Sequence, residues 1–152
     1  MDIVLRPARA EDVDALLILL KQLFEIESDF SFNEDRQRQG LELMLSERRN
    51  RCVLVAEVAG SVIGMASAQA LISTAEGDYV GLIEDVVVHR DYRGEGVGKK
   101  LLAALETWAE RHGLTRLQLL ADRSNQPALR FYSKAGWSET KMIALRKALK
   151  RS

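Results

Sequence analysis

Residues 86–98, VVVHRDYRGEGVG, run from an apolar strand into a glycine-rich turn. A run of valines with little alternation is typical of a central strand that is covered on both faces. From Val97 to Gly113 apolar side chains recur at helical spacing and the run ends at a glycine, which predicts an amphipathic helix. A strand, a glycine turn and a helix in this order direct backbone N–H groups outward at the positive end of the helix. This arrangement binds phosphates.

The spacing of the glycines narrows the choice of phosphate ligand. A Walker A loop needs Gly-x-x-x-x-Gly-Lys-Ser/Thr, but Arg93 takes the place of the first glycine and Lys100 that of the hydroxyl residue. A dinucleotide-binding fingerprint fails because Lys99 occupies the position of its third glycine. Neither ATP nor NAD is therefore supported. On the glycines alone, a tight turn that binds no ligand stays an open alternative.

The composition predicts one domain over residues 1–152. The chain is 47% apolar and 29% charged, which argues against disorder, collagen and a coiled coil. Lys and Arg together number 22, and so do Asp and Glu, so the net charge of zero excludes bulk attraction to nucleic acid or to an anionic membrane. Any bound anion must therefore be captured locally.

Cysteine and histidine are scarce. Cys52 is the single cysteine, which excludes an internal disulfide and fits a reducing compartment. His89 and His112 with one cysteine do not make a spaced metal site, so we expect no metal. The apolar run from Ala15 to Leu20 is too short for a membrane helix and does not form a signal peptide. We therefore expect a soluble, cytoplasmic protein.

Strands and helices alternate along the chain. We expect strands at residues 2–6, 52–58, 62–71, 79–88 and 115–121, and a last strand around 142–146. Helices are expected at about 10–24, 33–48, 97–112 and 125–135. Asn33 and Asn125 are predicted helix caps, Gly60-Ser61 a hairpin turn, and residues 72–78 a loop. This alternation predicts an α/β domain with a mixed sheet.

Two motifs resemble the GNAT N-acetyltransferase superfamily. Arg93, Gly96 and Gly98 match its acetyl-CoA-binding signature, Arg/Gln-x-x-Gly-x-Gly/Ala. Residues 125–137, NQPALRFYSKAGW, resemble its later Asn…Ala…Phe-Tyr…Gly-Phe/Trp motif. One departure is His89-Arg90, where many members have a proline. The resemblance implies a single-domain α/β fold with a mostly antiparallel, twisted sheet, flanked by helices and splayed at its central strands, and acetyl-CoA as co-substrate.

The resemblance also assigns the contacts to coenzyme A. Backbone N–H groups from Arg93 to Gly98 should hold the pyrophosphate, and main-chain groups of Val86 and Val88 should line the pantetheine arm. An N–H near Val86 would polarise the thioester carbonyl. Asn125 is explained equally by helix capping and by a coenzyme contact. The expected cofactor-binding residues are Val86, Val87, Val88, Arg93, Gly94, Glu95, Gly96, Val97, Gly98, Lys99 and Asn125.

Acetyl transfer to an amine needs a base and an acid. A primary amine with a reference pKa of about 10.4 is mostly protonated at neutral pH, so a base must take its proton. By resemblance to polyamine acetyltransferase-like members, Glu84 is the expected base, through a bridging water, and Asp85 a substrate-binding residue. In a regular strand only one of these neighbours would face the acceptor. Tyr132 stands where the family places the general acid for the departing thiolate.

The region between the first two helices predicts the acceptor. It combines acids with aromatic residues and has no basic residue between Lys21 and Arg36: Phe24, Glu25, Glu27, Asp29, Phe30, Phe32, Glu34 and Asp35. The family places its acceptor cavity beside this region, so Phe30 is an expected contact, and polyamine, aminoglycoside or lysine-like acceptors would suit it. The same acids also favour a helix start without any ligand.

The expected function is transfer of an acetyl group from acetyl-CoA to a primary amine of a small molecule or peptide by direct attack. Many relatives pair as dimers, so a homodimer is expected, with neither nucleic acid nor membrane as a partner. A non-catalytic acyl-CoA-binding or sensory domain is the alternative; Glu84 and Tyr132 argue against it. A covalent route through Cys52 is disfavoured, because no histidine lies near it in sequence.

Overall fold

The computed structural model describes residues 1–27 and 29–150. The chain divides into two compact units, Met1–Leu119 and Leu120–Ser152. The first unit holds a five-stranded sheet in the order β1-β2-β3-β4-β5. Its strands are β1 (Val4–Pro7), β2 (Arg51–Val58), β3 (Ser61–Ser73), β4 (Asp78–Val88) and β5 (Leu117–Leu119). β1 to β4 pair antiparallel and β5 runs parallel to β4, which confirms the mixed, mostly antiparallel sheet.

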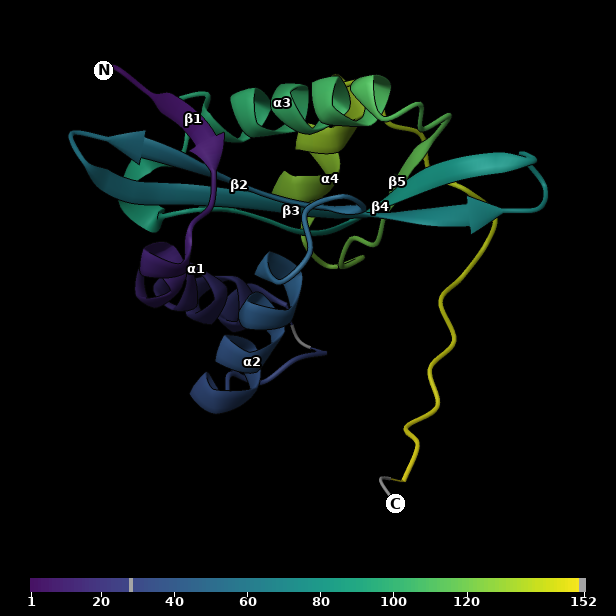
Figure 1. The fold of residues 1–152 in the computed structure, drawn as a ribbon, viewed down its shortest axis with the longest axis horizontal. Coiled ribbons are helices and arrows are strands. Elements are labelled where there is room, and N and C mark those ends of the chain that lie inside the picture. Colours follow the sequence, from purple (N-terminus) through teal and green to yellow (C-terminus); the bar gives the residue numbers. More distant parts are fainter. Residues whose placement is uncertain (28, 151–152) are drawn as a thin grey trace. The chain divides into compact units, whose positions relative to one another are not determined.

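Helices cover both faces of this sheet (Figure 1). α1 (Val13–Ile26), which follows the short helical turn η1 (Ala10–Asp12), lies on one face together with α2 (Glu34–Leu45), and α3 (Val97–Arg111) lies on the other. Leucines at helical spacing bury the inner face of α1 against the strands. The core between them includes Leu16, Leu19, Leu20, Leu23, Leu41, Val53, Val55, Met65 and Val87.

Two hairpins set the order of the strands. Ala59 and Gly60, with φ of 50° and 82°, form the turn between β2 and β3, one residue earlier than predicted. Two central residues with positive φ match the right-handed twist of the strands that they join. The predicted loop at 72–78 is wrong at both ends, because Ile72 pairs with Tyr79 and Ser73 with Asp78 across the second hairpin.

The ends of the helices follow the capping residues. The side-chain oxygen of Asn33 accepts a hydrogen bond from the Arg36 N–H at 3.0 Å, which confirms the cap of α2. Gly113, with φ of 69°, follows the end of α3 as predicted. α2 ends at Leu45 rather than near residue 48, and β5 covers 117–119 rather than 115–121.

The second unit carries α4 (Gln126–Lys134), which confirms the predicted short helix. The Asn125 side-chain oxygen caps it by accepting from the Ala128 N–H at 3.2 Å, and Gly136, with φ of 93°, ends it. Residues 138–150 form neither helix nor strand, so the strand predicted at 142–146 is wrong. A strand needs a ladder partner as well as apolar residues, and within the described residues this segment pairs with none.

Candidate functional site

β4 departs from regular pairing at Glu84. Ser67 of β3 pairs with Asp85, but the next residue, Ala68, pairs with Ile83. Glu84 is therefore the extra residue of a β-bulge. The rule that neighbouring residues face opposite sides holds only for a regular strand, so it does not decide between the two carboxylates. A bulge is typical of strands that border active sites.

The register shows which face of the sheet Asp85 occupies. Met65 and Val87 pair with each other, and both belong to the core that α1 covers. Ser67 and Asp85 lie two residues from Met65 and Val87 on the same strands, so their side chains face the α1 side of the sheet. Glu84, at the bulge, is exposed.

Asp85 and Ser67 are joined by two hydrogen bonds. The Ser67 hydroxyl donates to Oδ2 of Asp85 at 3.2 Å and accepts from the Asp85 backbone N–H at 3.2 Å. Ser67 is only 2% exposed. Burial raises the pKa of Asp85 to about 6, the neighbouring Glu84 carboxylate adds to the rise, and the hydrogen bond from Ser67 opposes it.

The edge of β4 opens beyond the bulge. β5 pairs with β4 only from Gly81 to Ile83, opposite Leu117 to Leu119. β4 continues to Val88 while it remains paired with β3 on its other side. In the first unit, residues 84–88 thus have a partner strand on one edge only. Main-chain groups on an open edge can pair with an extended ligand as a further strand would.

The glycine turn follows this open edge. Gly94 and Gly96 have φ of 80° and 82°, a backbone conformation that favours glycine. A Cβ at either position would meet no heavy atom within 4 Å among the described residues, and both glycines are exposed. Gly96 is the N-cap of α3, so the first turn of the helix has no side-chain cap in the described chain. Its N–H groups are suited to a phosphate.

The loop before the turn (Arg90–Tyr92, η2) is fixed on α1. The Arg90 N–H donates to the Gln22 side-chain oxygen at 3.0 Å, and the Arg90 guanidinium lies 3.5 Å from the Glu25 carboxylate. Gln22 is 5% exposed. Arg93 donates from Nε to the Val88 carbonyl at 3.1 Å. Gln22 was not predicted from the sequence, although a polar residue among the leucines of α1 is a signal for such a contact.

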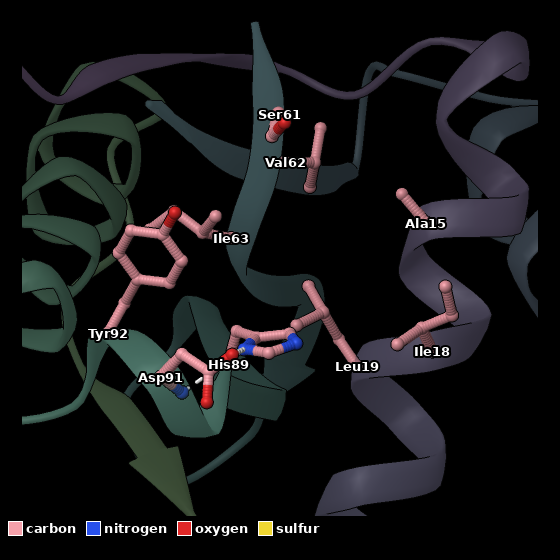
Figure 2. A pocket seen from close by; sticks show the side chains of 9 residues that line it. All are labelled: Ala15, Ile18, Leu19, Ser61, Val62, Ile63, His89, Asp91 and Tyr92. Carbon is pink, nitrogen blue, oxygen red and sulfur yellow. Dashed lines mark hydrogen bonds and ion pairs between the residues drawn. The ribbon is translucent and has the colours of Figure 1, made fainter. Parts of the chain in front are cut away.

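A cavity of about 320 Å³ lies on the α1 side of this loop (Figure 2). Ile18 and Leu19 of α1 line it opposite the start of β3, and His89 and Tyr92 line it from the loop. In the described chain, none of residues 93–98 lines it, so it is distinct from the glycine turn. No feature of the sequence predicted this cavity.

Tyr132 lies on α4, in the second unit, and is half-buried. Its ring contacts those of Phe131 and Trp137, with centroid distances of 5.2 Å and 5.9 Å. The Trp137 N–H donates to the Tyr132 carbonyl at 3.0 Å, which holds the end of the motif in place. Asn125 is a helix cap, as one of its two interpretations predicted. Its contact to coenzyme A stays a prediction.

Phe30 lies between α1 and α2. Its ring packs on Phe24 at a centroid distance of 5.5 Å and is 46% exposed. Two of the acids in this region have cationic partners, because Glu25 lies near Arg90 and Glu34 lies 3.3 Å from Arg38. The negative charge expected for an acceptor site is therefore partly neutralised here.

Two residues with reactive side chains have structural roles. His89 Nδ1 accepts from the Asp91 N–H at 3.1 Å, so this histidine caps the short helical turn η2. Burial raises the pKa of Cys52 to about 11, so its thiol stays protonated and is a poor nucleophile. Within residues 1–27 and 29–150, no three His, Cys, Asp or Glu side chains gather as a metal site would need. The helices described here include none with the length and apolarity to cross a bilayer.

Comparison with known proteins gives consistent matches. The model of the Acetyltransferase (GNAT) family matches residues 19–137. The chain is 29% identical to the aminoalkylphosphonate N-acetyltransferase of Salmonella typhimurium, over 90% of this chain and 85% of that one. It is 32% identical to the glucosamine 6-phosphate N-acetyltransferase of Trypanosoma brucei brucei, over 90% of each chain. The crystal structure of a possible acetyltransferase from Clostridium difficile 630 has the same fold, with a TM-score of 0.85 and 18% identity over 98% of this chain and 99% of that one.

Proposed function

The chain belongs to the GNAT acetyltransferase family and is an N-acetyltransferase, and from this premise we propose that it transfers the acetyl group of acetyl-CoA to a primary amine of a small molecule or peptide by direct attack. The observation that carries the proposal is the continuity of the site along one stretch of chain. The bulge with its two carboxylates, the open edge at 84–88 and, after the short turn η2, the glycine turn follow one another along the chain.

The glycine turn and the open edge would bind the coenzyme. N–H groups of the first turn of α3, with Lys99 and Lys100 beside them, suit the pyrophosphate. Main-chain groups of Val86 and Val88 suit the pantetheine arm, and an N–H near Val86 would stabilise the oxyanion of the tetrahedral intermediate. Arg93 already contacts the Val88 carbonyl, so we assign this side chain to shaping the turn as well.

The transfer moves two protons. The amine nitrogen forms a bond to the thioester carbon and loses a proton to a carboxylate of the Glu84–Asp85 pair. The carbon–sulfur bond then breaks, and the departing thiolate takes a proton from the Tyr132 hydroxyl. Tyr132 enters the proposal through its place in the second motif, in a helix that forms where the motif predicts one.

The acceptor is proposed to be a small amine. The exposed carboxylate of Glu84 favours an acceptor with a second cationic group, such as a polyamine. Both named relatives act on amines that carry a phosphonate or phosphate. A panel that contains spermidine, an aminoglycoside, 2-aminoethylphosphonate and glucosamine 6-phosphate separates the cationic from the anionic class.

The proposed location is the cytoplasm, and the proposed assembly is a homodimer. The buried thiol of Cys52 fits a reducing cytoplasm. Ile72 and Tyr79, which pair across the β3–β4 hairpin, are 73% and 49% exposed, and such apolar surface favours a homodimer. Sedimentation equilibrium tests the dimer directly, because a monomer at micromolar concentration would contradict it.

Calorimetry and turnover test the proposed function. We expect acetyl-CoA to bind, and thiol release to depend on an added amine. Gly96→Val should weaken acetyl-CoA binding at least tenfold by crowding the phosphate site. Gly60→Val is the matched control, because Gly60 has the same φ of 82° and the same open surroundings, but lies in the β2–β3 turn. Equal loss of binding in both variants, or no turnover with any amine, would refute the proposal.

A further inference from the structure

Resting on the proposed function, we propose that Asp85 takes the proton from the attacking amine, that buried Ser67 is its positioning residue, and that Glu84 binds a cationic group of the acceptor. This differs from the sequence-based expectation, in which Glu84 is the base. The bulge separates the roles, because it places two neighbouring carboxylates in unlike surroundings.

Ser67 fixes one oxygen of Asp85 and leaves the other available. The Ser67 hydroxyl oxygen accepts from the Asp85 N–H, so the hydroxyl proton is directed to Oδ2 of Asp85. Oδ1 has no hydrogen-bond partner among the described residues. The one buried side-chain polar atom found without a partner in the described chain is Nε of Arg6, so Oδ1 is not sealed in the core. This oxygen can therefore accept a proton from an acceptor on the α1 side of the sheet.

The surroundings of Asp85 hold few other charges. β3, the strand that pairs with β4 at Asp85, carries no ionisable side chain, and neither does β5, which pairs with β4 at residues 81–83. On the same face, α1 carries Asp14, Lys21 and Glu25, which are all exposed. α3 lies on the opposite face of the sheet. In the described chain, Glu84 is thus the charged group whose field acts on Asp85.

These surroundings make Asp85 a stronger base than an ordinary aspartate. The pKa of an ordinary aspartate, 3.8, lies about 6.6 units below that of a primary amine, whereas a pKa of about 6 narrows the difference to about 4.4 units. The equilibrium constant for proton transfer from the amine to Asp85 is then about a hundredfold larger than for transfer to an ordinary aspartate. Glu84 is exposed at the bulge, where its side chain is within reach of a cationic group of the acceptor. Two carboxylates whose surroundings separate their roles are a general device for acid–base chemistry.

The dependence of kcat/KM on pH tests the assignment. The amine is varied at saturating acetyl-CoA, and the wild-type profile should break near pH 6. Ser67→Ala removes a hydrogen bond to the ionised carboxylate, so the break should move to higher pH. Glu84→Gln removes a neighbouring negative charge, so the break should move to lower pH, with a raised KM for cationic amines. Asp85→Asn should lower kcat/KM about a hundredfold or more and abolish the break.

Two further variants separate positioning from folding. Ser67→Thr keeps the hydroxyl and should restore the wild-type break. Glu106→Gln removes an exposed carboxylate on α3 and should leave the profile unchanged. If Ser67 had only a structural role, Ser67→Ala would change stability or kcat at every pH. It would not move the break to higher pH while Glu84→Gln moves it to lower pH.

The outcomes distinguish this proposal from the proposed function. If the wild type binds acetyl-CoA but acetylates no amine, the proposed function fails and the assignment falls with it. If the wild type is active and Asp85→Asn keeps the break near pH 6, or if Ser67→Ala does not shift it, only the assignment is overturned. If the break is lost in Glu84→Gln and kept in Asp85→Asn, Glu84 and not Asp85 is the general base.

Discussion

Replacing Gly64 by alanine tests how closely α3 must approach the sheet. Gly64 lies on β3, and an added Cβ would sit 3.1 Å from both Cδ1 of Leu101 and Cγ1 of Val97, with Cβ of Ala56 at 3.5 Å. Leu101 and Val97 are 0% and 1% exposed, so neither can turn aside into solvent. Val97 is the first residue of α3 and follows the glycine turn. Crowding at Gly64 therefore acts directly on the proposed phosphate site.

The size of the effect follows from these contacts. Carbon atoms pack best at about 3.5–4.0 Å, so both neighbours must move by a few tenths of an ångström. Extra atoms in a well-packed core cost about 1–3 kcal/mol, from which the lower entropy of the unfolded chain recovers about 0.5–1 kcal/mol. We expect Gly64→Ala to lower the free energy of unfolding by about 1 kcal/mol, within a range of about 0–2.5 kcal/mol. Acetyl-CoA affinity should fall several-fold, because α3 is displaced.

The matched control is Gly40→Ala. Gly40 lies inside α2 with no heavy atom within 4 Å of an added Cβ. The same substitution should raise stability there by about 0.5–1 kcal/mol and leave acetyl-CoA binding unchanged. Urea unfolding followed by circular dichroism measures the first quantity, and calorimetry the second. A Gly64→Ala protein that is more stable than the wild type, like the Gly40→Ala control, would refute the reasoning.

Three further predictions concern single side chains. Tyr132→Phe should lower kcat at least tenfold with little change in acetyl-CoA affinity, and unchanged turnover with chemistry rate-limiting would exclude the acid role. Folding raises the pKa of Asp85, so the folded state binds more protons and stability falls as pH rises from 3.8 to about 6. Asp85→Asn should therefore raise the free energy of unfolding by up to about 3 kcal/mol at pH 7 but change it little at pH 3.5, as measured by urea unfolding. Asp12 affects the pH dependence of stability in the opposite direction. Arg6 holds it in two contacts of 2.8 Å and 2.9 Å and lowers its pKa, so Asp12→Asn should cost about 2 kcal/mol at pH 7 and progressively less below pH 4, and an equal cost at both pH values would contradict this.

Local signals in the sequence predicted most of the helices and strands. Helix ends depend on neighbouring residues, so Asn33, Asn125 and Gly113 marked them correctly. The places of the five strands along the chain, and of the glycine turn, followed from periodicity and composition in the same way.

Features that depend on pairing between distant residues could not be predicted. The bulge at Glu84 exists because β3 and β4 shift register by one residue between Ser67 and Ala68, and neither strand shows this alone. Ser67 is one of several small residues in β3, and its bond to Asp85 follows only from that register. The strand expected at 142–146 failed for the same reason, since apolar residues do not form a strand without a partner.

Amide chemical shifts during an acetyl-CoA titration test the central claim most directly. If main-chain N–H groups at the start of α3 hold the pyrophosphate, the largest shifts should fall on Gly94 to Lys99, and a second set on Val86 to Val88. Pantetheine, which lacks the pyrophosphate, should shift only the amides of Val86 to Val88. Tight binding of acetyl-CoA with the amides of residues 94–99 unmoved would contradict the account.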